Sequence, residues 1–107
     1  MTQITSLVDV CFDVVEAIPA QYRFTFSNQL LPAGISIPSN IAEGSRRPRK
    51  AYLNHLSYSL GSAAETETLF EIVRRRKLAP EALLTEGFTL AESAGRMLHG
   101  LVRSLEV

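Results

Sequence analysis

The sequence predicts an all-α protein, an antiparallel up-and-down bundle of four helices. Along four segments, apolar residues recur at alternating steps of three and four, the spacing that gives a helix one buried face. Only short connections separate the segments, near residues 19–23, 44–48 and 78–80, so neighbouring helices must run antiparallel. No stretch of useful length alternates apolar and polar residues as a strand would.

The first helix is marked by an apolar stripe that runs from Ile4 past Cys11 to Ile18. Pro19 closes this helix, because proline disfavours the helical conformation of the residue before it. The segment carries no base, and its acids lie off the stripe: Asp9, Asp13 and Glu16. The first helix therefore has one buried face and one acidic face.

The second helix is expected from about Phe24 to Glu43 and contains two prolines, Pro32 and Pro38. Each proline removes a backbone donor and crowds the carbonyl four residues back, which costs ~3 kcal/mol or more inside a helix. We therefore expect a kinked helix in which Gly34 relieves the crowding near Pro38. Gly44 stands where a helix C-cap favours glycine.

The third helix is expected from Pro48 to about Lys77, which makes it ~40 Å long at 1.5 Å per residue. Pro80 opens the fourth helix, whose apolar residues recur at intervals of seven, as suits nearly parallel helix packing. Its row is Leu84, Ala91, Leu98 and Leu105. Glycine weakens a helix, so Gly87 and Gly95, eight residues apart, indicate one face that packs tightly, either in the bundle or across a subunit boundary.

Length and composition point to a single globular domain, residues 1–107. Hydrophobic residues make up 46% and charged residues 21%, and the formal net charge is zero, so no global field attracts the chain to nucleic acid or a membrane. Cys11 is the only cysteine, which excludes an internal disulfide. We recognise neither a signal peptide nor a membrane span, so the expected location is cytoplasmic.

The cations are unevenly placed, and most of them fall into two clusters. These are Arg46, Arg47, Arg49 and Lys50, and Arg74, Arg75, Arg76 and Lys77. The second cluster ends the third helix, where the helix dipole favours positive charge, so a structural role suffices there. The first cluster precedes a helix N-terminus, where the dipole disfavours cations, so helix stability does not explain it.

Three interpretations of the first cluster stay open: an acidic face of a neighbouring helix or subunit, a solvated loop, or a nucleic-acid backbone. The first helix, with its three acids, is a candidate neighbour. The two clusters lie at opposite ends of a long helix, so one monomer offers two weak patches. A ring of subunits would multiply each patch, and useful affinity would then come from avidity.

Several polar residues interrupt apolar stretches, and such residues must be hydrogen-bonded if they are buried. They are Asn40, Glu43, Ser62 and Glu65. An acid–base pair is the catalytic interpretation. A structural network that fixes helix register is favoured, because nothing nearby resembles a nucleophile, an electrophile or a phosphate-binding loop.

No metal or cofactor site is expected. A di-iron bundle needs Glu-x-x-His pairs, but the residues three before His55 and His99 are Tyr52 and Arg96. Cys11 lies on the apolar stripe, as a small buried hydrophobe would. The two histidines have no evident partner. We therefore predict that the protein is not an enzyme and binds no small-molecule substrate.

Residues 36–44 read Ser-Ile-Pro-Ser-Asn-Ile-Ala-Glu-Gly. This stretch resembles the signature of a bacterial four-helix-bundle family first noted in intervening sequences of large-subunit ribosomal RNA genes. The resemblance continues in the third helix through Tyr52, Gly61, Ser62 and Glu65, and in the fourth through Arg96-Met97-Leu98-His99-Gly100-Leu101. It departs at Leu31 and Pro32, where the family commonly carries basic residues, and in the absence of Trp.

The resemblance implies a bundle that assembles as a homopentameric barrel. Relatives of similar architecture are accessory proteins of diversity-generating retroelements and bind nucleic acid and a reverse transcriptase. Self-association is also expected from apolar residues that lie off the main stripes: Phe12, Phe24, Tyr58 and Leu90. The leading hypothesis is thus a homo-oligomeric scaffold that contacts DNA, RNA or a nucleic-acid enzyme through both cation clusters. The alternative is a protein-interaction or purely structural oligomer.

Overall fold

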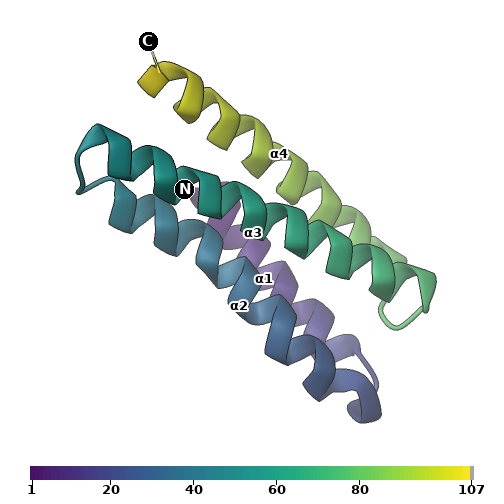
Figure 1. Ribbon diagram of the computed structural model, residues 1–107. Coiled ribbons are helices and arrows are strands. Elements are labelled where there is room, and N and C mark those ends of the chain that lie inside the picture. Colours follow the sequence, from purple (N-terminus) through teal and green to yellow (C-terminus); the bar gives the residue numbers. More distant parts are fainter. Residues whose placement is uncertain (107) are drawn as a thin grey trace.

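The computed structural model describes residues 1–106 and is built of four antiparallel α-helices (Figure 1). They are α1 (Thr2–Ala17), α2 (Ala20–Gly44), α3 (Arg49–Arg75) and α4 (Glu81–Glu106). α1 and α3 each pack against both α2 and α4, and the molecule measures 46 × 21 × 20 Å. No strand occurs among residues 1–106. The predicted four-helix fold is confirmed.

α2 begins four residues before the predicted start at Phe24. Pro19 is its N-cap, with an extended backbone, and the helix begins with Ala20. The apolar pattern missed this first turn because all of its side chains, through Arg23, are exposed. An exposed turn carries no hydrophobic periodicity from which it could be recognised.

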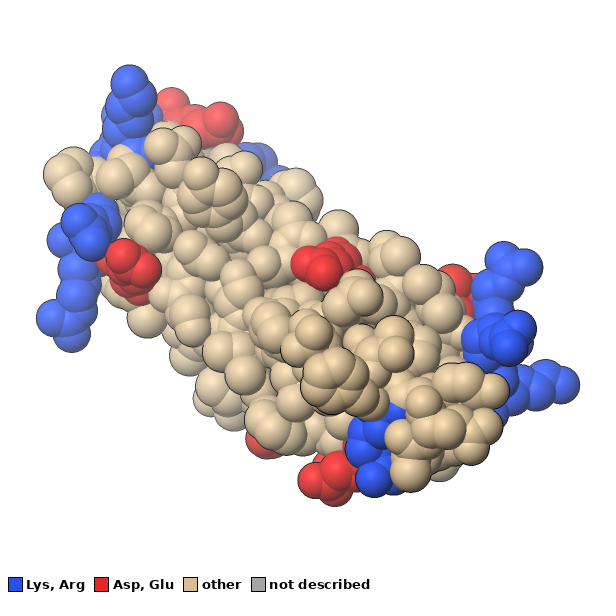
Figure 2. All heavy atoms as spheres, turned by 60° about the horizontal axis from the view of Figure 1, so that its bottom comes forward, with Lys and Arg blue, Asp and Glu red and all other residues tan. Residues whose placement is uncertain are grey.

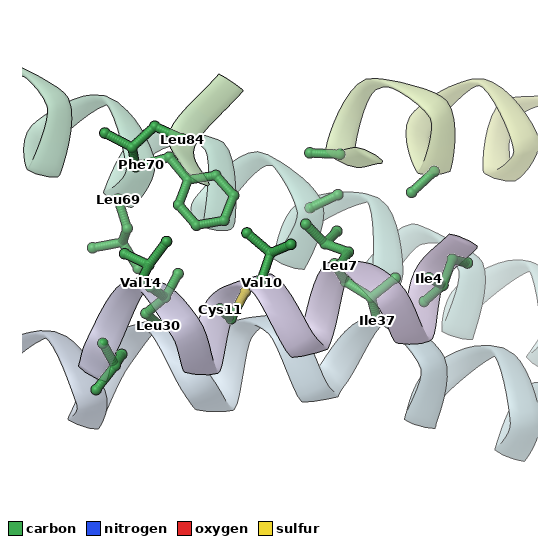
Figure 3. Close-up of a cluster of buried hydrophobic side chains, with 14 of the residues drawn as sticks. Ile4, Leu7, Val10, Cys11, Val14, Leu30, Ile37, Leu69, Phe70 and Leu84 are labelled. Atoms are coloured by element: carbon green, nitrogen blue, oxygen red, sulfur yellow. The ribbon is translucent and has the colours of Figure 1, made fainter. Parts of the chain in front are cut away.

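The core lies between the four helices along the length of the bundle (Figure 3). Val14 of α1 lies beside Leu30 of α2 and faces Phe70 of α3. Leu7 of α1 lies beside Ile37 of α2, and all five side chains are fully buried. The predicted row on α4 also faces inward, and its members Leu84, Ala91 and Leu98 are at most 1% exposed. The apolar stripes read from the sequence thus converge on one interior.

Pro32 and Pro38 both lie inside α2, which continues through them as one helix. The hydroxyl of Ser59 on α3 donates a hydrogen bond to the carbonyl of Ile37, the residue before Pro38, at 2.9 Å. This bond fixes α3 to α2 beside the proline. The kink itself stays a prediction.

Gly44 is the last residue of α2, and the predicted C-cap role is wrong: Ser45 is the C-cap, in the right-handed helical conformation. The glycine is explained by the neighbouring helix. A Cβ at Gly44 would lie 2.6 Å from Cβ of His55 and 2.9 Å from Cδ1 of Tyr52. Gly34 likewise permits close packing, since its Cβ would lie 2.9 Å from Sγ of Cys11.

The predicted close packing of α4 is confirmed at Gly87 but is not found within the bundle at Gly95, where packing across a subunit boundary stays a prediction. A Cβ at Gly87 would lie 2.6 Å from Cε2 of Phe70, whereas a Cβ at Gly95 would meet nothing within 4 Å. A separation of eight residues exceeds two helical turns by about 80°, so the two glycines do not share a face. Only Gly87 is turned toward α3.

Candidate nucleic-acid interface

The antiparallel order places nearly all cations at the two ends of the molecule. The α2–α3 end also holds the C-terminus of α4, and its cations are Arg46, Arg47, Arg49, Lys50 and Arg103. The α3–α4 end also holds the start of α2, and its cations are Arg23, Arg74, Arg75, Arg76 and Lys77. Only Arg96 lies between the ends. Figure 2 shows this separation on one face, with blue side chains at both ends of the long axis.

At the α2–α3 end, two of the four predicted residues have a partner. Arg47 pairs with Glu43 at 3.2 Å, and both side chains are exposed, so the pair contributes little to stability. Nε of Arg49 donates a hydrogen bond to the carbonyl of Leu105 in α4. Arg46 and Lys50 are exposed and have no side-chain partner among residues 1–106.

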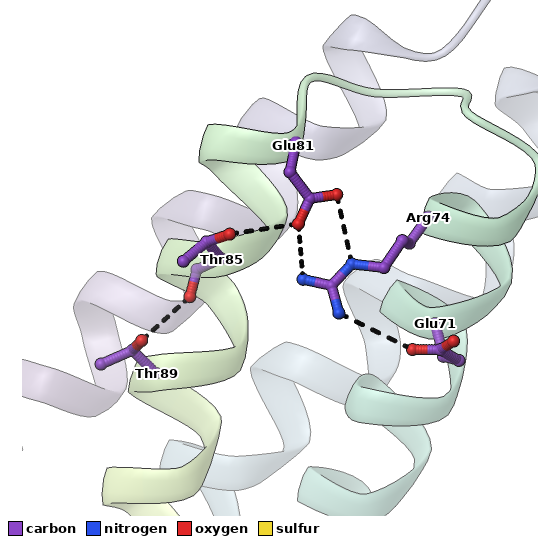
Figure 4. Close-up of polar contacts among 5 residues, drawn as sticks. All are labelled: Glu71, Arg74, Glu81, Thr85 and Thr89. Atoms are coloured by element: carbon purple, nitrogen blue, oxygen red, sulfur yellow. Dashed lines mark hydrogen bonds and ion pairs between the residues drawn. The ribbon is translucent and has the colours of Figure 1, made fainter.

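At the α3–α4 end, Arg74 is a structural residue. Its Nε and Nη2 donate to the two carboxylate oxygens of Glu81 at 3.2 and 2.7 Å, and Glu71 lies 3.9 Å away (Figure 4). The guanidinium also lies 4.4 Å from the centroid of the Phe88 ring. Arg74 therefore joins α3 to α4, a structural role different from the interaction with the helix dipole expected from the sequence.

The three residues after Arg74 differ from it. Arg75, Arg76 and Lys77 are exposed, and none has a side-chain hydrogen bond or ion pair with a described residue. Positive charge here is favoured by the end of α3. These cations are nevertheless available to a partner, since no contact within the described chain holds them.

Arg23 is a cation whose role the sequence reasoning missed. Its Nη2 donates to the carbonyl of Ile18 at 2.9 Å and to that of Glu16 at 3.3 Å, and its Nε donates to Ile18 at 3.2 Å. These carbonyls end α1, which has no base in its own last turn. Arg23 caps α1 from the next helix, and its position five residues after the C-cap residue Ile18 was the available signal.

A polar network joins α2 to α3 within the signature. Nδ2 of Asn40 donates to the carbonyl and to the hydroxyl of Ser36, both at 3.0 Å. Ser62 of α3 donates to the same Ser36 hydroxyl at 2.8 Å. Oδ1 of Asn40 lies 2.9 Å from Nδ1 of His55, and because an amide oxygen can only accept, Nδ1 of His55 is the donor. The network thus contains Asn40 and Ser62, together with Ser36 and His55.

Two parts of the sequence interpretation of this region are wrong. Glu43 and Glu65 are exposed, Glu43 pairing with Arg47, so neither carboxylate is a buried member of the network. His55 does have a partner, Asn40. The signal for Ser36 was its position four residues before Asn40, which places both side chains on one side of a helix.

The remaining candidate groups form no reactive constellation. Burial raises the pKa of the Cys11 thiol from 9.0 to about 12, so the thiol is neutral at physiological pH. His99 is exposed. Within residues 1–106 there is no group of three side chains suited to a metal ion and no pocket. None of the described helices carries an apolar stretch that would let it cross a bilayer.

The fold and the charge distribution define a class of small helical bundles with cationic ends. Residues 2–100 match the family of 23S rRNA-intervening sequence proteins, and the chain belongs to that family. A similar solved structure is that of a protein of unknown function from the S23 ribosomal protein family of Bacteroides thetaiotaomicron VPI-5482. The two sequences are 23% identical, and the structures superpose with a TM-score of 0.70. The match covers 90% of this chain and 97% of the other chain. No curated protein matches the sequence.

Proposed function

We propose that the protein is a non-enzymatic, self-associating helical scaffold that contacts nucleic acid, or an enzyme acting on nucleic acid, through its cationic ends. The observation that carries this proposal is the separation of charge. Every Lys and Arg except Arg96 lies at an end of the molecule, although the net charge is zero. Five cations are exposed and form no side-chain hydrogen bond or ion pair with any of residues 1–106: Arg46 and Lys50 at one end, and Arg75, Arg76 and Lys77 at the other.

Phosphate neutralisation explains why such a charge distribution would be useful. Each phosphate neutralised by a cation releases counterions and adds to affinity at low salt. A patch of two or three cations gives only weak binding, so several copies of each patch are needed. A homo-oligomer, with the pentamer of the family resemblance as the proposed form, would supply them by avidity. A reverse transcriptase is the proposed protein partner.

Binding to nucleic acid is tested by fluorescence anisotropy with labelled single- and double-stranded DNA and RNA at low ionic strength. We expect binding that weakens as salt is raised and that weakens further when Arg46 and Lys50 are replaced by Ser. The matched control compares Arg46→Ser with Arg96→Ser, because both remove one exposed cation but only Arg46 lies at an end. Absence of binding at low salt, or equal loss in the two single variants, contradicts the proposal.

Self-association is supported by large apolar side chains left in solvent. Phe24 of α2 is 77% exposed, Ile35 of α2 is 43% exposed and Ile72 of α3 is 42% exposed. Contact with other subunits would remove this surface from water. Light scattering at micromolar concentration should give a mass that is a multiple of 11.8 kDa. A stable monomer under these conditions rules out the oligomeric scaffold.

The alternative function is a protein-interaction or purely structural oligomer without a nucleic-acid role. It is favoured by the zero net charge and by the partners that Arg47, Arg49 and Arg74 find within the chain. In that case, partners recovered with the tagged protein from cells stay bound after treatment with DNase and RNase. Partners lost on nuclease treatment support the first proposal.

A further inference from the structure

Tyr58 is a largely exposed aromatic residue whose position the fold does not explain. It lies on α3, its side chain is 65% exposed, and its hydroxyl makes no hydrogen bond with a described residue. A large apolar ring that is exposed to water does not stabilise the bundle, because such a ring contributes to stability only when it is buried. Its exposure is explained if the ring meets a partner.

The ring of Tyr58 is nevertheless oriented by a contact with a neighbouring ring on α3. The His55 ring packs against it edge-on, with centroids 6.4 Å apart and an interplanar angle of 79°. His55 is in turn oriented by Asn40, whose amide is fixed by Ser36. The polar network of the signature therefore ends at the surface in an oriented aromatic pair. An oriented ring loses less conformational entropy on binding than a free one.

The same ring is joined to the cations of the α2–α3 end by one ridge on α3. Lys50, Asn54 and Tyr58 follow one another at steps of four, so they form an oblique ridge that turns about 80° around α3 between Lys50 and Tyr58. Eight residues of helix place Tyr58 about 12 Å along the axis from Lys50. Arg46 and Arg47 lie just before α3, beyond Lys50. An extended strand that follows this oblique ridge reaches both the cations and the exposed aromatic.

Resting on the proposed function, we infer that Tyr58 is a stacking platform for an unpaired base, and that the ligand at the α2–α3 end is single-stranded nucleic acid. A base stacks on the Tyr58 ring while Lys50, Arg46 and Arg47 contact the phosphates that follow it. Aromatic stacking along a cationic track is how proteins bind single strands with little sequence preference. The bases of a duplex are already stacked and paired, so they are not available to Tyr58.

The first experiment measures affinities of the full chain for an unstructured single-stranded 12-mer and for a duplex of the same length. Tyr58→Ala should weaken single-strand binding about 5- to 100-fold and leave duplex binding unchanged, whereas Tyr58→Phe should retain most of the affinity. Phe12→Ala is the matched control, because Phe12 is an exposed aromatic on α1, a helix that contains no Lys or Arg. Circular dichroism checks that each variant folds. Equal losses for both strand types, or for Phe12→Ala, overturn the inference.

The second experiment uses the absence of tryptophan in the chain. Tyr58→Trp introduces a single fluorophore, and adding the single-stranded 12-mer should quench its emission by base stacking, while the emission of Phe12→Trp stays unchanged. If emission of Trp at position 58 instead shifts to the blue with protein concentration alone, a second copy of the chain covers this site and the inference is wrong. Anisotropy that shows binding without quenching overturns the platform but retains the proposed function. Absence of binding in the anisotropy titration overturns both the stacking platform and the proposed function.

Discussion

Lys77 adopts a backbone conformation that ordinarily belongs to glycine. It follows the end of α3 with φ of 56°, the only positive φ of a non-glycine residue among residues 1–106. Its N–H donates to the carbonyl of Arg74, and the N–H of Leu78 donates to that of Val73, both at 3.0 Å. This is the Schellman arrangement, in which the residue with positive φ is usually glycine because a Cβ is disfavoured there.

We predict that Lys77→Gly stabilises the protein by about 1 kcal/mol, because glycine removes the steric cost of the left-handed conformation. The free energy of unfolding is measured by urea denaturation. Lys77→Ala is the control, since it removes the same charge but keeps a Cβ. Equal stabilisation by both substitutions would show that charge repulsion within the cluster, rather than backbone conformation, is relieved.

Cys11 makes the free energy of unfolding depend on pH in the alkaline range. Burial raises the pKa of its thiol from 9.0 to about 12. Because the pKa is higher in the folded chain, the thiol's contribution to stability is complete below pH 9 and is lost as pH rises toward 12. One group of this kind lowers the free energy of unfolding by at most about 1.4 kcal/mol per pH unit.

The expected result is a decline in unfolding free energy above pH 9 that is steeper for the wild type than for Cys11→Ala. Tyrosines and lysines titrate in the same range, but they are present in both proteins, so the difference between the two slopes reports the thiol. Parallel slopes would show that the thiol is as easily ionised in the folded chain as in the unfolded one.

At the scale of helices, α2 and α3 approach each other closely at Gly44. We predict that Gly44→Ala destabilises the protein by about 1–3 kcal/mol, since the new Cβ would overlap Cβ of His55, which lies too near its own backbone to move away. Gly61→Ala is the matched control, because a Cβ there meets nothing within 4 Å and alanine is the better helix former by up to about 1 kcal/mol. Thermal unfolding of both variants should shift in opposite directions, and a shift in the same direction contradicts this account of the α2–α3 contact.

Features that depend on the residue pattern of a single helix were predicted from the sequence, whereas features that depend on the contact between two helices were missed. The apolar stripes that contain Leu7 and Leu84 repeat within their own segments, so the bundle and its core were visible in the pattern alone. The reason for Gly44 was not visible, because it lies in His55 of the opposing helix. The contact between His55 and Asn40 was not visible either, because it depends on the register of α2 against α3, which the pattern within each helix does not give.

The candidate site divides in the same way. The clusters at Arg46 and Arg75 were evident as runs of charge, and the antiparallel fold then explains why they lie at opposite ends. That Arg74 is held by Glu81 and Phe88 could not be predicted, because both partners lie on α4 beyond the turn. Arg74 was therefore grouped with neighbours that are chemically alike but, unlike Arg74, face solvent.

For the whole molecule, the important quantity is the separation of the two cationic ends. The bundle is 46 Å long, and the body between its ends carries Arg96 as the only cation. A stacked strand rises ~3.4 Å per nucleotide, so about 14 nucleotides are needed to reach from one end to the other. Short strands can bind one end of a subunit at a time, and only longer strands can connect both.

We therefore predict that the salt dependence of binding increases with strand length. For a single-stranded 6-mer, replacing Arg75, Arg76 and Lys77 by Ser should leave the affinity for the α2–α3 end intact. For a 20-mer, the slope of log Kobs against log salt should be steeper than for the 6-mer, and the triple substitution should reduce it by about 2, since each lost phosphate contact on a single strand contributes about 0.7. The measurement is an anisotropy titration at four or more salt concentrations. Equal slopes for the two lengths would show that a strand uses only one end of the bundle, and the scaffold would then present its two cationic ends to different partners.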